Sequence, residues 1–276
     1  MLFQSYIFIL LFLPLCLLGF WGLKRQKLLQ LWLIAFSLWF YGAASPYYLL
    51  LLLGSIAWNY AFFRAIERGI GRVPERVSGS AMERAEYGME RDSSRKRLLL
   101  GIGIAGNLAL LCFFKYFNAI SAGWSQMKGL EDPILQLALP LGISFFTFQQ
   151  IGFLADAYKG EVGACSLREY VLFVSFFPYV SSGPIVNVQE MLPQYRQIGR
   201  QRLDWAKFAG GLYLFALGLS KKVLLADTFG KAVDAGYGNV AGLSGTDAWL
   251  VMLFYTLQLY FDFSGYCDMG RGIAHM

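Results

Sequence analysis

Apolar runs long enough to cross a lipid bilayer recur along this chain, and they constrain its fold more than any other feature. A span needs about 20 mostly apolar residues, because the hydrocarbon core is about 30 Å thick and a helix rises about 1.5 Å per residue. Four runs come close to or meet that length without strong interruption: residues 2–23, 28–45, 46–63 and 98–117. The sequence therefore predicts an all-α polytopic membrane protein.

Four later apolar runs contain internal Gly, Pro, Gln or Asp: residues 133–157, 170–188, 208–226 and 248–265. Each is predicted to be a span, a re-entrant piece or a broken helix, which brings the expected total to six to eight membrane segments. A helix that starts at Leu167 should break before Pro178 and again before Pro184, because the residue before a proline avoids the helical conformation. We expect this piece to be re-entrant.

Composition and charge agree with a membrane protein. Apolar residues make up 57% of the chain and charged residues 15%, against roughly 25% charged in soluble domains. The net charge of +6 comes from short basic clusters between apolar runs, which anchor loops and do not indicate nucleic-acid binding. The four cysteines are widely spaced in or beside apolar segments, so we interpret them as small buried hydrophobes.

The distribution of Lys and Arg predicts three regions and an orientation. Residues 1–63 would form three transmembrane helices, residues 64–97 a charged cytoplasmic loop, and residues 98–276 a membrane core. The loop holds nine Lys or Arg and six Asp or Glu, and its mixed charges suggest a solvated segment, with or without a short surface helix. Basic residues follow the first span, so the N-terminus is predicted outside. No Lys or Arg precedes that apolar run, so we expect a retained span, not a signal peptide.

The highest polar content within an apolar element lies near the C-terminal end, in residues 257–269. On a helix, Tyr255, Gln258, Asp262 and Tyr266 would share one face by i, i+3, i+4 spacing, and Ser264 and Asp268 would form a second pair. A carboxylate at membrane depth costs several kcal/mol unless it is paired or hydrated, so Asp262 is a candidate functional residue. The alternative is an edge position where Asp262 caps a helix or pairs with Lys221 or Lys222.

A second polar cluster runs from Ser144 to Gln150. Ser144 and Thr147 can hydrogen-bond back to helix carbonyls, whereas Gln149 and Gln150 need a polar partner or water. This element is therefore expected to line a cavity or to pack on another polar helix.

Other site chemistry is weakly represented. The one histidine, His275, has no visible orienting partner and is expected in a frayed tail, so it is not assigned a catalytic role. The sequence shows no phosphate-binding loop, no metal-ligand cluster and no nucleophile elbow. Catalytic residues are therefore not assigned in this chain.

Four motifs carry a resemblance to a known family. In chain order they are LPLGISFFTFQQ (139–150), FFP with SGPI (176–178 and 182–185), Lys221-Lys222 with Ala226-Asp227, and LQLYFDFSGYCDM (257–269). Together they look like the membrane-bound O-acyltransferase family, and most like its alginate O-acetyltransferase branch. The D-alanyl transfer protein of teichoic acid modification is similar but more distant.

The resemblance implies a multi-pass enzyme of the bacterial inner membrane that acetylates an exported polysaccharide such as alginate. Its donor would be acetyl-CoA or another cytoplasmic acyl thioester, with no bound cofactor. Its partners would be the bilayer, the donor and a periplasmic or extracellular polysaccharide-acetylating protein. A buried acyl channel would then explain six polar residues: Gln149, Gln258, Asp262, Ser264, Tyr266 and Asp268.

One departure from the family concerns its essential histidine, which lies well downstream of the motif that matches FDFSGYCD. Residues 98–276 thus resemble a family core truncated before that histidine, and this polypeptide alone is expected to be inactive. The alternative function is a transporter or flippase component for a lipid-linked or thioester substrate, since re-entrant Pro-Gly segments and polar helices fit it too. We found no inverted repeat of the kind that many transporters show.

Overall fold

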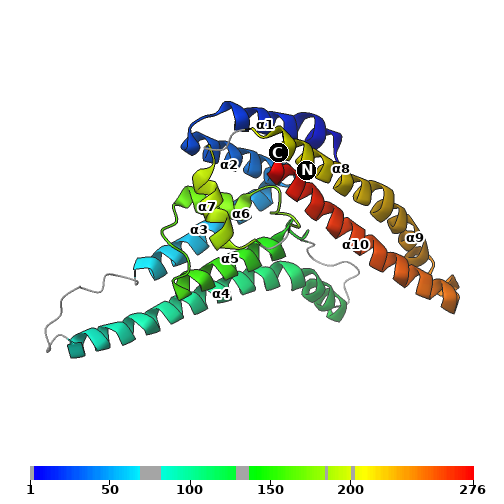
Figure 1. Cartoon of the computed structure of the whole chain (residues 1–276). Coiled ribbons are helices and arrows are strands. Elements are labelled where there is room, and N and C mark those ends of the chain that lie inside the picture. The colour runs from blue at the N-terminus through cyan, green and yellow to red at the C-terminus, as the bar shows by residue number, and fades with distance from the viewer. Residues whose placement is uncertain (1–2, 69–81, 129–136, 184–185, 200–202) are drawn as a thin grey trace. The chain divides into compact units, whose positions relative to one another are not determined.

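The structure is a computed structural model that describes residues 3–68, 82–128, 137–183, 186–199 and 203–276, with only the backbone described for residues 82–93. Every regular element within these residues is a helix (Figure 1), as the sequence predicts. The helices belong to two compact units. The first comprises Met1–Phe36, Phe176–Pro184 and Gln197–Met276, and the second comprises Ser37–Ser175 and Ile185–Arg196.

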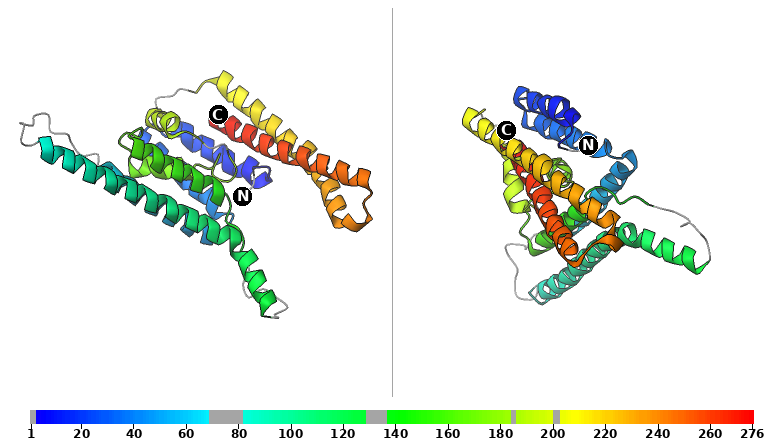
Figure 2. Two further views of the ribbon diagram at one scale, coloured as in Figure 1. Left: turned by 90° about the horizontal axis from the view of Figure 1, so that it is seen from below. Right: turned by 90° about the vertical axis from the view of Figure 1, so that its right-hand side faces the viewer.

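The first unit is built around α10 (Gly245–His275), the longest helix in it. Alongside α10 runs a continuous helical stretch made of α8 (Trp205–Ser220), the π-helical turn η2 (Lys221–Ala226) and α9 (Asp227–Gly238), as Figures 1 and 2 show. A 3₁₀ turn, η3 (Val240–Gly242), connects α9 to α10. The unit also contains η1 (Phe8–Phe12), α1 (Leu13–Gly22) and the first part of α2 (Gln26–Gly42).

Glycines allow α8 and α10 to touch backbone to backbone. A Cβ atom placed on Gly211 would lie 2.7 Å from the carbonyl oxygen of Gly272, and one on Gly218 would lie 2.6 Å from that of Gly265. The two glycines on each helix are seven residues apart and therefore share a face. Small residues of this kind let membrane helices approach closely where no hydrophobic effect drives them together.

The second unit contains the rest of α2 and five further helices: α3 (Pro46–Arg68), α4 (Met82–Met127), α5 (Ile143–Lys159), α6 (Leu167–Ser175) and α7 (Val188–Gln197). Helices α3, α4 and α5 pack on one another, and α6 packs on α3 and α5. Its core is aromatic: Phe63, Phe153 and Tyr170 are almost fully buried, and the Phe153 ring contacts the other two.

Three helical stretches of the described residues are long and apolar enough to cross a membrane: Pro46–Arg68, Ser94–Met127 and Trp205–Gly238. Their most apolar windows are only 33%, 17% and 17% buried inside the structure. Apolar helices with so much exposed surface are typical of contact with lipid. The shorter apolar helix Phe8–Gly22 is a further piece of this kind, and the expected total of six to eight segments stays a prediction.

Several predicted boundaries were wrong. In the described part of the run at residues 133–157 the helix begins at Ile143, because Pro140 and Gly142, with φ of +69°, do not continue a helix. The run at 208–226 continues as helix to Gly238 through η2, and the last run extends to His275. His275 therefore ends a helix and does not lie in a frayed tail.

The expected loop at residues 64–97 is also narrower than predicted. Helix α3 continues to Arg68, and α4 already begins at Met82, so only residues 69–81 of this region lie outside the described part of the chain. The charged residues from 82 to 97 are good helix formers and extend the apolar helix that follows them. The cytoplasmic placement of this region stays a prediction.

The predicted break before Pro178 is confirmed. Helix α6 begins at Leu167 and ends at Ser175, two residues before Phe177-Pro178. Most of the non-helical residues 176–183 are nonetheless buried, with Phe177 and Val180 each 1% exposed. Irregular backbone at membrane depth is tolerated only where protein or a water-filled cavity surrounds it. The second break, before Pro184, and the expected re-entrant path fall partly outside the described residues.

The glycine contact between α8 and α10 yields a test with an adjacent control. Gly211→Leu should destabilise the protein by about 1–3 kcal/mol, because the new side chain would overlap the backbone of α10. A Cβ on Gly210 meets nothing within 4 Å, so Gly210→Leu should be neutral or slightly stabilising. Thermal unfolding of the detergent-solubilised protein measures both, and equal effects of the two changes would contradict the close approach.

Candidate functional site

Two consecutive lysines in η2 meet the polar residues of α10. Lys221 Nζ lies 2.5 Å from Asp268 Oδ2 and donates a hydrogen bond of 3.1 Å to Ser264 Oγ. This pair is partly buried, with side-chain exposures of 28% for Lys221 and 15% for Asp268. The predicted pairing of Ser264 and Asp268 on one face is confirmed, and Lys221 is the partner that they share.

Lys222 joins a second pair of carboxylates. Its Nζ lies 2.8 Å from Asp262 Oδ1 and 3.0 Å from Asp227 Oδ1. The Asp262 side chain is 50% exposed, although it belongs to an apolar helix. Of the alternatives for Asp262, the structure therefore shows pairing with Lys222, and the remaining exposed surface of this carboxylate requires water or another polar group.

The local backbone explains why neighbouring lysines both reach α10. Successive residues of a regular helix point about 100° apart, but Lys221 and Lys222 lie in η2, which is a π-helical turn and departs from that spacing. Such turns are often found at functional sites. The glycine contact between Gly218 and Gly265 lies one turn before Lys221 and between Asp262 and Asp268. The close approach of the two helices thus determines which lysine meets which carboxylate.

The other two candidates on α10 have different neighbours. Tyr266 Oη lies 2.5 Å from Ser181 Oγ in the broken segment, and the Tyr266 ring stacks on Phe3 at 4.8 Å. Gln258 packs against Gly230 of α9, and its buried Oε1 atom has no hydrogen-bond partner within the described residues. Tyr266 and Asp262 lie four residues apart on the continuous helix α10, as predicted, but they meet different neighbours along its length.

Gln149 belongs to the second unit, and its neighbour Gln150 is part of a buried polar network. Gln150 Nε2 donates to Ser55 Oγ at 2.9 Å and its Oε1 accepts from Tyr170 Oη at 3.1 Å. One helical turn further along α3 from Ser55, Asn59 exchanges two side-chain hydrogen bonds with Asn107 of α4, of 3.0 and 2.6 Å. The expected polar partners of the two glutamines therefore exist. Thr147, in contrast, has a buried hydroxyl that finds no hydrogen-bond partner among the described residues, the carbonyls of its own helix included.

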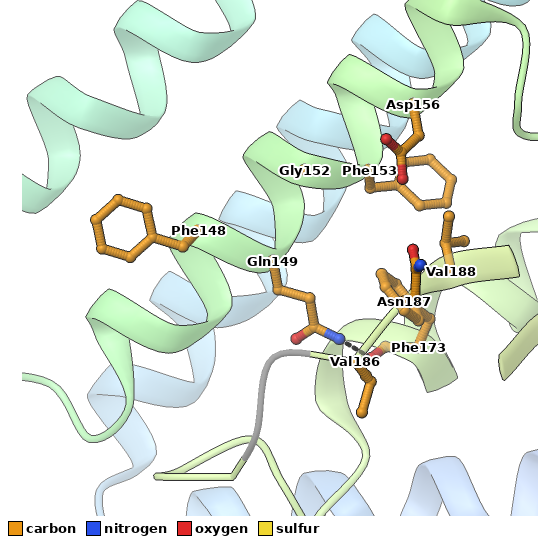
Figure 3. Close-up of a pocket in the computed structure, with 9 residues that line it drawn as sticks. All are labelled: Phe148, Gln149, Gly152, Phe153, Asp156, Phe173, Val186, Asn187 and Val188. Carbon is orange, nitrogen blue, oxygen red and sulfur yellow. Dashed lines mark hydrogen bonds between the residues drawn. The ribbon is translucent and has the colours of Figure 1, made fainter. Parts of the chain in front are cut away.

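The Gln149 side chain, which belongs to α5, caps the C-terminal end of α6 and lines a cavity. Its Nε2 donates to the Phe173 carbonyl at 2.9 Å, one of the last carbonyls of α6, which lack partners within the helix. The cavity has a volume of about 240 Å³ and opens along one face of α5 (Figure 3). Nine residues line it: Phe148, Gln149, Gly152, Phe153, Asp156, Phe173, Val186, Asn187 and Val188.

An ion pair holds α7, which begins at one wall of this cavity, against α6. Arg196 Nε lies 2.9 Å from Glu169 Oε1, and Arg196 also donates to the Ala164 carbonyl. The other oxygen of Glu169 accepts from the backbone and hydroxyl of Ser166, each at 2.8 Å, in a capping box at the start of α6. Burial alone would raise the pKa of Glu169, but the hydrogen bonds from Arg196 and Ser166 lower it overall.

The described residues hold no catalytic constellation of a familiar type. His275 is exposed at the end of α10, and no group of three or more His, Cys, Asp or Glu residues in the described part could hold a metal ion. Burial raises the pKa of the Cys165 thiol to about 12, so this cysteine is no thiolate nucleophile. Cys16 is also buried, but Cys112 is exposed, which the sequence interpretation did not foresee.

The family model for MBOAT, the membrane-bound O-acyltransferase family, matches residues 95–275. The chain belongs to the membrane-bound O-acyltransferase family. This region includes α10, η2 and the cavity beside Gln149. The matched region therefore includes all six candidate residues: Gln149, Gln258, Asp262, Ser264, Tyr266 and Asp268.

Two of the relatives described here match the chain across essentially its whole length, and a third matches half of it. It is 36% identical to the peptidoglycan O-acetyltransferase of Helicobacter pylori, covering 99% of this chain and 54% of that protein. It is 35% identical to the probable alginate O-acetylase AlgI of Pseudomonas putida, covering 100% of this chain and 53% of that protein. The teichoic acid D-alanyltransferase of Lacticaseibacillus rhamnosus is 26% identical over 49% of this chain. The chain spans about half the length of the relatives that match it throughout.

The region that matches the membrane-bound O-acyltransferase family model also includes Lys221 and Lys222. From the sequence, Lys221 and Lys222 were treated as possible partners of Asp262 and as part of a family motif but not as site residues, although adjacent lysines within an apolar run are costly in a membrane. This energetic cost was the signal in the sequence that could have identified the two lysines as site residues. It shows that both lysines need internal partners, which α10 supplies.

The Glu169–Arg196 pair makes stability depend on pH. Because the pKa of Glu169 is lowered from its ordinary value of 4.5, the pair stabilises the fold at neutral pH and this contribution disappears as pH falls through the lowered pKa. Glu169→Gln should therefore lower the melting temperature at pH 7 and have little effect once the pH is well below 4.5. Glu190→Gln, at an exposed position of α7, serves as the control, and a pH-independent effect of Glu169→Gln would contradict the assignment.

Proposed function

We propose that the protein containing this chain transfers an acyl group, in the first instance acetyl, from a cytoplasmic thioester such as acetyl-CoA to hydroxyl groups of an exported polysaccharide. The observation that carries the proposal is the match along essentially the whole chain to two relatives named for acetylation of different polymers, peptidoglycan and alginate. What those names share is an acetyl ester on a cell-envelope or exocellular polymer. We do not choose between the two polymers.

This acyl transfer needs no bound cofactor. The acceptor hydroxyl attacks the thioester carbonyl, a C–O bond forms as the C–S bond breaks, and the hydroxyl proton passes to a base while the thiol leaves. No residue of this chain is assigned as that base, and His275 is not proposed for it. The chain would instead supply part of the passage through which donor and acceptor meet.

Six polar residues are proposed to line this passage: Gln149, Gln258, Asp262, Ser264, Tyr266 and Asp268. Asp262 supports the idea best, because its carboxylate stays half exposed even though it pairs with Lys222. A charged group in this position needs hydration, and a water-filled passage supplies it. Asp268 and Ser264, held by Lys221, would stiffen the wall of the passage rather than contact a substrate.

The proposal places the protein in the bacterial inner membrane as a multi-pass protein with its N-terminus on the periplasmic side. A periplasmic partner protein would present the polymer to it. The relatives reported above are all named for acetyl or D-alanyl transfer, and nothing in their names favours the transporter or flippase alternative.

Acetate on the polymer tests the proposal. The full protein that contains this chain is expressed in a host lacking its own polysaccharide O-acetyltransferase, and alkali-labile acetate is measured on the exported polymer. Asp262→Ala and Gln149→Ala should each lower acetylation by at least about tenfold if the residues line the passage.

Two matched substitutions control for general damage. Asp234→Ala on α9 and Gln194→Ala on α7 remove the same side-chain types from exposed positions and should leave acetylation near the unmodified level. Full acetylation by Asp262→Ala and Gln149→Ala at normal protein levels would exclude these residues from the passage. Absence of polymer acetate with the unmodified protein would contradict the function itself.

A further inference from the structure

The cavity beside Gln149 is a narrow site two helical turns long. Gln149 and Asp156 are seven residues apart on α5, which places them on one face and about 10 Å apart along the axis. Gly152 lies between them, and a Cβ atom there would meet nothing within 4 Å, so this wall is open. The volume of about 240 Å³ is smaller than that of typical drug-sized sites, and a slender group fits it.

Hydrogen-bond acceptors dominate the polar lining. Gln149 is 6% exposed, its amide nitrogen is engaged by the Phe173 carbonyl, and its Oε1 has no hydrogen-bond partner within the described residues. Figure 3 shows this side chain, Asn187 and Asp156 around the cavity. None of the nine lining residues, all of them described, carries a positive charge.

The end of the cavity at Asp156 is negatively charged. Gln189 Nε2 lies 3.5 Å from Asp156 Oδ2 and donates to Glu161 Oε2 at 3.2 Å, so two carboxylates share one neutral amide. The walls are aromatic: Phe153 and Phe173 are each 1% exposed, and Phe148 is 49% exposed. Aromatic faces and carboxylates attract cations and donors, while the Asp156 carboxylate repels an anion at this end of the cavity.

We propose that this cavity is a binding site for a slender group that is uncharged or cationic and donates hydrogen bonds, and that it excludes anions. Gln149 Oε1 accepts from one end of the group and Asp156 from the other. The inference concerns the chemistry of the cavity alone. It stands or falls independently of acyl transfer.

Cysteine labelling measures this selectivity directly. In the full protein, with its native cysteines replaced by Ala, Gly152→Cys places a thiol in the open wall without a clash. Methanethiosulfonate reagents that carry trimethylammonium, hydroxyl or sulfonate groups then react with it, and each rate is divided by the rate with free 2-mercaptoethanol. The corrected cationic rate should exceed the anionic rate by at least about tenfold, because a carboxylate lies nearby. The uncharged reagent should fall between them.

Two further variants connect the selectivity to the cavity. Adding Asp156→Asn to Gly152→Cys should bring the cationic and anionic rates together. Gly163→Cys is the matched control, since it lies outside the cavity with open space around its Cβ, and Asp156→Asn should not change its ratio.

Three results would overturn the proposal: a corrected ratio near one, a ratio that Asp156→Asn leaves unchanged, or no reaction with any reagent in protein that elutes as a single folded species. If Gly152→Cys fails to fold, Asn187→Cys reports on the same cavity from an exposed position, with the same expected ratios.

Discussion

A polar side chain on a membrane-exposed helix has no water to bind, and this constraint underlies most of the polar contacts in the structure. In the first unit Lys221 and Lys222 find carboxylates on α10. In the second, Asn59 and Asn107 satisfy each other between α3 and α4, the two helices of that unit that are apolar enough to be spans. Both solutions direct polar atoms inward and leave apolar surface for lipid.

Close helix packing decides which polar groups meet. Gly218 and Gly265 bring α8 and α10 into backbone contact, and the π-helical turn that follows directs both lysines at α10. A bulky residue at either glycine would separate Lys221 from Asp268 and leave two partly buried charges unpaired, which costs far more than losing an exposed pair. The glycines are therefore as important to the polar cluster as the charged residues themselves.

Part of this arrangement was predictable. Proline predicted the end of α6 before Pro178, and the cost of isolated polar groups predicted partners for Gln149, Gln150 and Asp262. The exact partners were not predictable, because Lys221 and Asp268 are 47 residues apart in sequence and only tertiary packing joins them. Helix ends were missed for a similar reason: apolar composition cannot show that α10 continues to His275.

The account depends above all on the contact between η2 and α10, and a double-mutant cycle tests it most directly. Lys221→Met, Asp268→Asn and the combined variant are compared by free energy of unfolding in detergent, beside the same cycle for Lys222 and Asp262. The account predicts a coupling energy of about 1–3 kcal/mol for Lys221–Asp268, because this pair is the more buried. It predicts less than about 1 kcal/mol for the half-exposed Lys222–Asp262 pair. Coupling near zero for Lys221–Asp268 would contradict the contact.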